Sequence, residues 1–125
     1  MKLFFITCLG AIQLLLAACG GSGLSIVKPD VDVDMINQSS EDLSNASAKF
    51  GDNICKWGAV GRTFTAGFMS YPHPITHDVE LSWDHAEIHK VEKMDLRKIY
   101  PRGKSGRLIF TVYDDRVEVV FHERA

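Results

Sequence analysis

The sequence predicts a mainly β protein: a small antiparallel β-sandwich or meander that follows a disordered N-terminal tether. Two segments near the C-terminus, residues 107–113 and 116–122, alternate apolar and polar side chains and are joined by only two residues. A third segment, residues 79–83, alternates in the same way after two prolines. Because a period of two is typical of strands with one buried face, these segments indicate a sheet.

The C-terminal hairpin is the best-defined of these elements. Asp114 and Asp115 form the connection, and aspartate suits a tight turn because it bonds to nearby backbone and tolerates a positive φ. Closing the turn there fixes the register, since directly opposed side chains lie on the same face. The predicted apolar pairs are Val112 with Val117, Phe110 with Val119 and Leu108 with Phe121.

The segment from residue 84 to residue 100 is open to two interpretations. Asp84 with Glu87 three residues later fits a capping box, and Pro101 would end a helix, which favours a helix over 85–99 and an α+β fold. The apolar residues of the segment, however, form no single helical stripe. We therefore favour a strand from Ile88 to Leu96, with the helix as the alternative.

The globular domain is expected to begin near residue 54. Residues 60–68 are apolar and spaced by glycines, which predicts one or two short strands with bulges or close backbone contacts. Residues 19–53 are expected to form the lipidated N-terminus and a flexible tether, because they are rich in Gly, Ser and acids and contain no aromatic residue before Phe50. Residues 54–125 would then be the folded unit.

Acidic residues in this tether have the spacing of a calcium-binding EF-hand loop. Asp30, Asp32, Asp34 and Glu41 occupy positions 1, 3, 5 and 12 of such a loop. Met35 stands where that loop needs glycine for its sharp turn. A solvated extended segment is therefore the simpler interpretation.

An apolar run opens the chain and stops abruptly at a cysteine. The run from Leu3 to Leu16 would extend about 21 Å as a helix, too short for the hydrocarbon core of a bilayer but typical of a signal peptide. The tetrapeptide Leu16-Ala17-Ala18-Cys19 that follows resembles the lipobox of bacterial lipoproteins. The resemblance implies a signal peptide over residues 1–18, cleavage before Cys19 and acylation of Cys19. The alternative is an ordinary secreted protein that is cut after Ala18.

The lipobox resemblance also implies a location. Gly20, directly after the cysteine, resembles the class of lipoproteins sorted to the outer membrane. The expected location is thus the cell envelope, with the protein held by acyl chains in the outer membrane and facing the periplasm. The layout is similar to that of short Gram-negative envelope lipoproteins, some of which are immunity proteins or enzyme inhibitors.

The sequence offers no motif for catalysis, a cofactor or a metal. Removal of Cys8 and acylation of Cys19 would leave Cys55 as the only thiol, so no disulfide within the chain is expected. His85 and His89 have the spacing of two zinc ligands on a helix, but the glutamate of the zincin motif is misplaced, and on a strand the two would lie about 13 Å apart. The formal net charge of −2 gives no argument for nucleic-acid binding.

We therefore expect a non-enzymatic, lipid-anchored binding or structural module. The alternative is a periplasmic immunity protein or inhibitor of a toxin or hydrolase, and a metal-dependent enzyme is a third hypothesis. Expected partners are the membrane, through the acyl chains, and an envelope protein or an anionic glycan. Candidate partner-binding residues come from a proline- and histidine-rich segment, a basic loop and isolated aromatic side chains: Tyr71, His73, His77, Trp83, Tyr100, Arg102 and Lys104.

Overall fold

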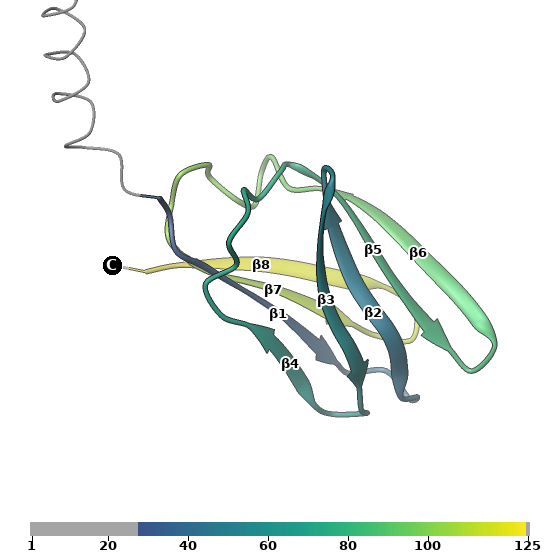
Figure 1. Ribbon diagram of the computed structural model, residues 1–125. Coiled ribbons are helices and arrows are strands. Elements are labelled where there is room, and N and C mark those ends of the chain that lie inside the picture. Colours follow the sequence, from purple (N-terminus) through teal and green to yellow (C-terminus); the bar gives the residue numbers. More distant parts are fainter. Residues whose placement is uncertain (1–27, 125) are drawn as a thin grey trace, which may run out of the picture.

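A computed structural model describes residues 28–124, which form a β-sandwich of two four-stranded sheets (Figure 1). The strands are β1 (Val31–Asn37), β2 (Leu43–Phe50), β3 (Asn53–Val60), β4 (Thr65–Phe68), β5 (Asp78–His85), β6 (Ile88–Asp95), β7 (Gly106–Val112) and β8 (Val117–Glu123). One sheet has the order β4-β1-β7-β8 and the other β3-β2-β5-β6. The mainly β prediction is confirmed. The predicted signal peptide and lipidation site lie outside the described residues.

All strand pairs are antiparallel except β1 with β7, which run parallel. A parallel pair needs a crossover, and here the chain crosses to the second sheet between these two strands. β1 consequently lies in the middle of its sheet, between β4 and β7. No helix within residues 28–124 has the length and apolar character needed to span a membrane.

The core lies between the two sheets and is joined across them by aromatic side chains. Phe50 from β2 and Phe110 from β7 are fully buried, with ring centroids 6.5 Å apart. The ring of Trp57 meets Phe110 edge-on at 6.1 Å, and its Nε1 donates a hydrogen bond of 3.0 Å to the carbonyl oxygen of Val33 on β1. Such aromatic pairs stabilise by about 1 kcal/mol beyond the area they bury.

The predicted C-terminal hairpin is confirmed together with its register. β7 and β8 pair Val112 with Val117, Phe110 with Val119 and Leu108 with Phe121. The members of these pairs on β7 are fully buried. The register follows from the two-residue turn, because any one-residue slip would turn the apolar side chains to the solvent face.

The strand interpretation of residues 88–96 is also confirmed, and the helix alternative is wrong. β6 pairs with β5 along its whole length, from His85 opposite Ile88 to Asp78 opposite Asp95. The reversal occurs at Ala86, whose positive φ of 56° suits a tight turn. β6 is an edge strand, and its inner face carries Lys90 and Glu92 as well as Met94. That mixture explains why the apolar residues form no helical stripe.

The predicted tether is wrong for residues 31–53, because these residues form β1, β2 and the start of β3. Val31, Val33 and Met35 project into the core, while Asp32 and Asp34 alternate with them on the outer face of the sheet. β2 contributes Leu43, Ala46, Ala48 and Phe50 to the core. The domain therefore begins about 23 residues earlier than predicted.

Candidate functional site

β1 runs from one end of the sandwich to the other, and the two ends carry different residues. At its beginning, the Gly106 amide donates to the Asp30 carbonyl oxygen at 3.1 Å and the Tyr71 amide to that of Val31 at 2.8 Å. We call this region, comprising residues 28–30, 69–77 and 96–105, the loop end. At the opposite end of β1 the Gln38 amide donates to the Val112 carbonyl oxygen at 2.8 Å. We call that region, with the turns at 86–87 and 113–116, the cleft end.

Three aromatic residues predicted as partner-binding hot spots are largely buried in the core. Tyr71, Trp83 and Tyr100 are only 4%, 5% and 2% exposed. Tyr71 packs against Phe50, and Tyr100 meets the ring of Phe121 edge-on at 4.9 Å. Tyr71 and Tyr100 close the core at the loop end, so little of either side chain is open to a partner, and their role in binding stays a prediction.

The other predicted partner-binding residues gather at the loop end. His73, Arg102 and Lys104 are exposed there, and the half-buried His77 has its Nε2 3.2 Å from the carbonyl oxygen of Tyr100. The structure thus brings together the two segments in which these residues were predicted. Of the two cations, Lys104 has a carboxylate partner, Glu123, at 3.9 Å.

Arg97, in the same basic segment, is fully committed to two carboxylates. Its guanidinium lies 3.3 Å from Asp78 and 3.0 Å from Asp95. Hydrogen bonds from the backbone and side chain of Arg97 hold the pKa of Asp95 below its ordinary value. Lys98 and Arg102, by contrast, form no ion pair within residues 28–124, so the loop end keeps unpaired positive charge.

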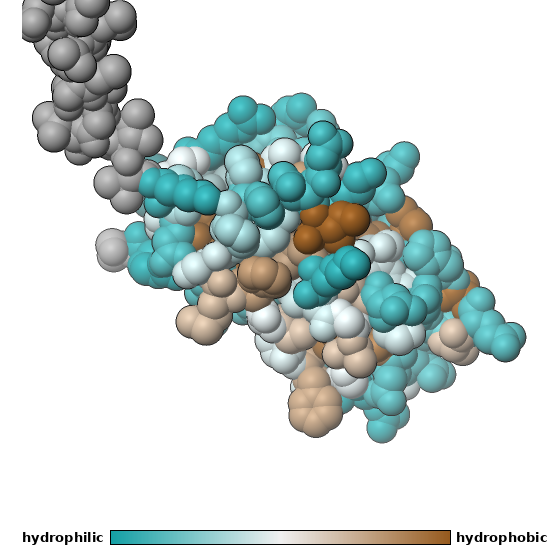
Figure 2. Space-filling model, viewed as in Figure 1, coloured by the Kyte–Doolittle hydropathy of each residue, from teal (hydrophilic) through white to brown (hydrophobic). Residues whose placement is uncertain are grey.

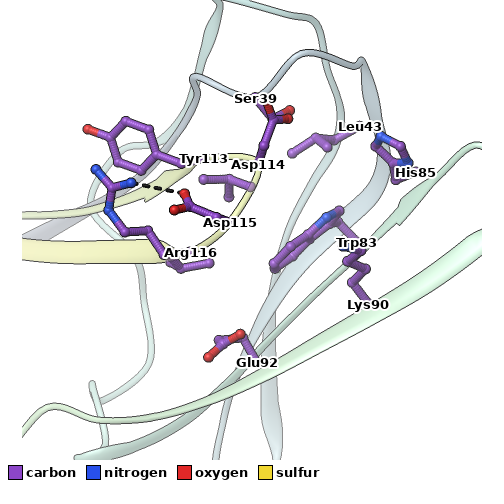
Figure 3. A pocket seen from close by; sticks show the side chains of 12 residues that line it. Ser39, Leu43, Trp83, His85, Lys90, Glu92, Tyr113, Asp114, Asp115 and Arg116 are labelled. Atoms are coloured by element: carbon purple, nitrogen blue, oxygen red, sulfur yellow. Dashed lines mark hydrogen bonds and ion pairs between the residues drawn. The ribbon is translucent and has the colours of Figure 1, made fainter.

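The cleft end carries a hollow that the sequence did not predict (Figure 3). The cleft has a volume of about 130 Å³ and opens between the inner face of β6 and the β7–β8 turn. Trp83 from β5 lies between these walls. Lys90 and Glu92 form the β6 wall, and residues 113–117 form the opposite wall. Strand pairing explains this geometry, since Lys90 lies directly opposite Trp83 and shares its inner face.

The turn wall of the cleft is held rigidly by hydrogen bonds and ion pairs. Asp114 accepts hydrogen bonds of 2.8 Å from both the amide and the hydroxyl of Ser40, and these hold the pKa of its carboxyl below the ordinary value. Arg116 pairs with Asp115 at 2.9 Å and lies over the Tyr113 ring, 4.1 Å from its centroid. A turn fixed at several points presents its polar groups in one arrangement, which lowers the entropic cost of binding a ligand.

The β6 wall, by contrast, presents polar groups that are not paired. Within residues 28–124 neither Lys90 nor Glu92 forms an ion pair. Beside them, Nδ1 of His85 is buried and finds no hydrogen-bond partner in the same range. A ligand carrying both a donor and an acceptor could satisfy these groups together.

Neither the serine hydroxyl of the cleft nor the Cys55 thiol is arranged as a nucleophile. Ser39 is the one serine among the residues that line the cleft, and its hydroxyl is occupied by a 2.6 Å bond to the Asn37 side chain and a 3.0 Å bond to the Glu41 carbonyl oxygen. A serine nucleophile would instead need its proton directed to a base. Cys55 lies elsewhere in the core, and burial raises the pKa of its thiol to about 12.

The histidine pair considered as a zinc site is divided between the two faces of its sheet. His85 lies opposite Ile88 and lines the cleft, whereas His89 lies opposite Asp84 on the outer face and its Nδ1 is 2.6 Å from that carboxylate. Residues 28–124 contain no group of three or more potential ligands close enough to hold a metal ion. The hairpin turn, which falls between the two histidines, is what separates them.

The acidic residues with EF-hand spacing are likewise used by the fold. Asp32 pairs with Arg124 at 3.3 Å and Asp34 with Arg107 at 3.3 Å, both on the outer face of the sheet. Asp34 lies among buried residues, and this burial raises its pKa, while Arg107 opposes the shift. Each carboxylate is thus committed to an arginine rather than to a shared cation.

Comparison with known proteins yields a likeness of fold and no family. No family model and no curated protein matches the chain. A protein from Eubacterium rectale, whose structure was determined by NMR, is similar with a TM-score of 0.52 at 14% identity, over 78% of this chain and 92% of that one. At this identity the likeness concerns the fold alone, so function has to be argued from the site.

Proposed function

We propose that the protein is a lipid-anchored lipoprotein of the cell envelope, held in the outer membrane and facing the periplasm, that acts as a non-enzymatic binding module. The observation that carries this proposal is the position of the cleft relative to the start of the domain. β1 begins at the loop end and runs about 23 Å toward the cleft end, a length set by its seven residues. A chain anchored at Cys19 would reach the loop end first.

The length of chain before the domain supports this orientation. Residues 20–30 separate the lipobox cysteine from β1 and span at most about 40 Å when fully extended. With so short a connection the loop end would stay near the membrane. The cleft would then face the periplasm, where a ligand can reach it.

The composition of the cleft favours an envelope protein over an anionic glycan as the ligand. Three carboxylates, from Glu92, Asp114 and Asp115, line it against two cations, Lys90 and Arg116. An anionic glycan would meet a net negative wall, whereas a polypeptide segment can supply a cation and an acceptor together. If that protein is a toxin or a hydrolase, the module is an inhibitor or immunity protein.

The anchor is tested with the full chain, expressed with its leader in bacteria that are fed labelled fatty acid. We expect the wild type to be labelled and recovered with membranes, and Cys19→Ser to lose both properties. Cys8→Ser, which alters the other cysteine of the leader segment, should keep them. A Cys19→Ser protein that is still labelled and membrane-bound would rule out the lipoprotein assignment.

The cleft is tested by affinity capture from detergent-solubilised envelope, with residues 20–125 as bait, since this piece retains all eight strands. A partner of the cleft should be lost on Lys90→Glu or Glu92→Lys, which reverse single charges on an exposed edge strand. Lys93→Glu, on the outer face of the same strand, is the matched control and should retain the partner. Capture that survives both cleft variants would place the binding surface elsewhere, and hydrolase assays on a captured enzyme would separate inhibition from simple binding.

A further inference from the structure

The four outer strands of the sandwich are not equally protected against pairing with another chain. β3, β6 and β8 each carry at least one charged residue, whereas β4, Thr65–Phe68, carries none. Charges on an edge strand oppose pairing with foreign strands, and natural sheets use them for this purpose. β4 is therefore the edge strand that is least protected against pairing with another strand.

The backbone of β4 has hydrogen-bonding groups directed away from its sheet. The Asn37 amide donates to the Phe64 carbonyl oxygen at 3.0 Å, next to the pair of Ile36 with Thr65. In an antiparallel pair, alternate residues direct their N–H and C=O groups to the neighbour, so Ala66 and Phe68 use both groups on β1. Phe64 uses only its carbonyl oxygen there, because its amide donates to the Gly61 carbonyl oxygen at 3.0 Å. Thr65 and Gly67 consequently direct their groups to the free edge, and Met69 continues this alternation one residue past the strand.

The two most exposed large apolar side chains of the described residues flank this strand. Phe64 is 68% exposed and Met69 is 78% exposed. In Figure 2, pale and brown side chains follow the lower left margin of the molecule, where Figure 1 draws β4. An apolar, uncharged edge with free backbone groups is the pattern of a strand that accepts a partner strand.

We propose that β4 pairs antiparallel with β4 of a second copy of this chain, about a two-fold axis that passes through Gly67. The free groups are symmetric about this residue: Thr65 of one copy lies opposite Met69 of the other, and Gly67 lies opposite itself. A two-fold interface must be complementary to itself, and this register satisfies the same three residues in both copies. It joins the two β4-containing sheets into one and brings Phe64 and Met69 of each copy to the junction.

The position of the glycine agrees with this arrangement. Gly67 lies on the outer face beside Asp34, and a Cβ added to it would come within 3.0 Å of the Asp34 carboxylate. At the axis the two glycines lie opposite each other, so no pair of identical side chains has to be packed there. A four-residue strand buries less than the roughly 800 Å² per partner of a standard interface, so we expect a dimer that dissociates on dilution.

The dimer is tested by sedimentation of residues 20–125 over a range of concentrations, which does not depend on the lipid anchor. We expect the wild type to shift from one chain to two as concentration rises. Met69→Lys and Thr65→Pro should stay monomeric, because the first adds a charge to the edge and the second removes one of its donors. Thr65→Pro leaves the bonds to β1 intact, since the Thr65 amide faces outward. Ile88→Lys, at another exposed apolar residue, is the control and should dimerise like the wild type.

The register is tested by disulfide formation under mild oxidation. The double variant Thr65→Cys with Met69→Cys should form covalent dimers, because these positions lie opposite each other between copies. Thr65→Cys alone should not, because its counterpart is four residues away, about 13 Å along the strand. Cys55 does not compete, being buried with a pKa of about 12. A chain that is monomeric at every concentration, or a dimer unaffected by Met69→Lys and Thr65→Pro, overturns the proposal. Cross-linking by Thr65→Cys alone overturns the register.

Discussion

Asn37 is the buried polar residue whose removal should most affect the fold. Its Nδ2 donates to the carbonyl oxygens of Glu41 at 2.8 Å and Val60 at 2.9 Å. Its Oδ1 accepts from the amide of Ser39 at 2.9 Å and from the hydroxyl of the same residue at 2.6 Å. One fully buried amide thus joins the end of β1 to the end of β3 and fixes the β1–β2 connection, which lines the cleft.

Replacing Asn37 with alanine removes all four bonds at once. A typical hydrogen bond contributes about 1 kcal/mol net, and a buried group left without a partner costs about 1 to 3 kcal/mol. The Val60 carbonyl oxygen is in a buried residue and loses its side-chain donor, as does the carbonyl oxygen of Glu41. We expect Asn37→Ala to lower the free energy of unfolding by about 3 kcal/mol, a large part of the 5 to 15 kcal/mol typical of a domain.

Asn37→Asp separates hydrogen bonding from side-chain shape. The aspartate has nearly the same size, but when ionised it turns an oxygen toward the two carbonyl oxygens, so at neutral pH it should cost more than alanine. Burial and these acceptors favour the protonated form, which raises the folded-state pKa of the new carboxyl above its unfolded value. Stability should therefore fall as pH rises through the acid range.

The measurement is urea denaturation of residues 20–125 at about pH 5 and pH 7, monitored by tryptophan fluorescence. The exposed neighbour Gln38 provides the control, and Gln38→Ala should change stability by less than about 0.5 kcal/mol. The reasoning fails if Asn37→Ala stays within that same range. It also fails if Asn37→Asp is as stable as Asn37→Ala at both pH values.

Three further predictions concern the core, the outer face and the thiol. Phe110→Asp should unfold the domain and Thr111→Asp should be tolerated, as judged by circular dichroism; equal tolerance would contradict the observed alternation. Arg107→Ala should destabilise by about 1 to 2 kcal/mol at pH 7 and by less in acid, because burial already raises the pKa of Asp34 and the loss of the arginine raises it further. Asp34→Asn added to that variant should restore stability at pH 7, and no recovery would refute the pairing. Cys55, with a pKa of about 12, should resist a thiol reagent at pH 8 until the protein unfolds; rapid reaction of native protein would show an open core.

Strand pairing could be predicted from the sequence where a short turn joins two adjacent strands and so determines their register. In the β7–β8 hairpin the turn residues and the alternation give the same register, so each supports the other. β6 is harder to predict, because it is an edge strand with charged residues on its inner face. It therefore lacks the regular alternation of apolar and polar residues that marks a strand with one buried face. The main evidence for a strand at Ile88–Asp95 is that its apolar residues form no helical stripe.

The N-terminal strands could not be recognised from local pattern alone. β1 alternates aspartate with valine, which reads as a solvated segment until Arg107 and Arg124 are known to lie beside it. Both arginines lie more than 70 residues away in the chain, and β1 pairs with β7 in parallel across a similar separation. Contacts of this range leave no local sequence signal.

The candidate site was predicted only in part for the same reason. The sequence offers the histidine-rich segment and the basic loop as separate candidate surfaces, and the structure places both at the loop end. The exposure of an aromatic side chain, however, depends on which other residues pack against it. Tyr71 and Tyr100 pack against Phe50 and Phe121, which are about 20 residues away in the chain. The cleft combines β5–β6 with the β7–β8 turn, so no single segment contains it.

The inner face of β6 links the protection of a sheet edge to the presence of the cleft. Lys90 and Glu92 point inward at the outermost strand, which discourages a foreign strand from adding there. The same two charges cannot enter an apolar core without a large desolvation cost, so the sheets remain apart beside them and Trp83 lies at the bottom of the resulting hollow. Charges at this edge thus leave a polar cleft, whereas the uncharged β4 at the opposite edge is free to pair.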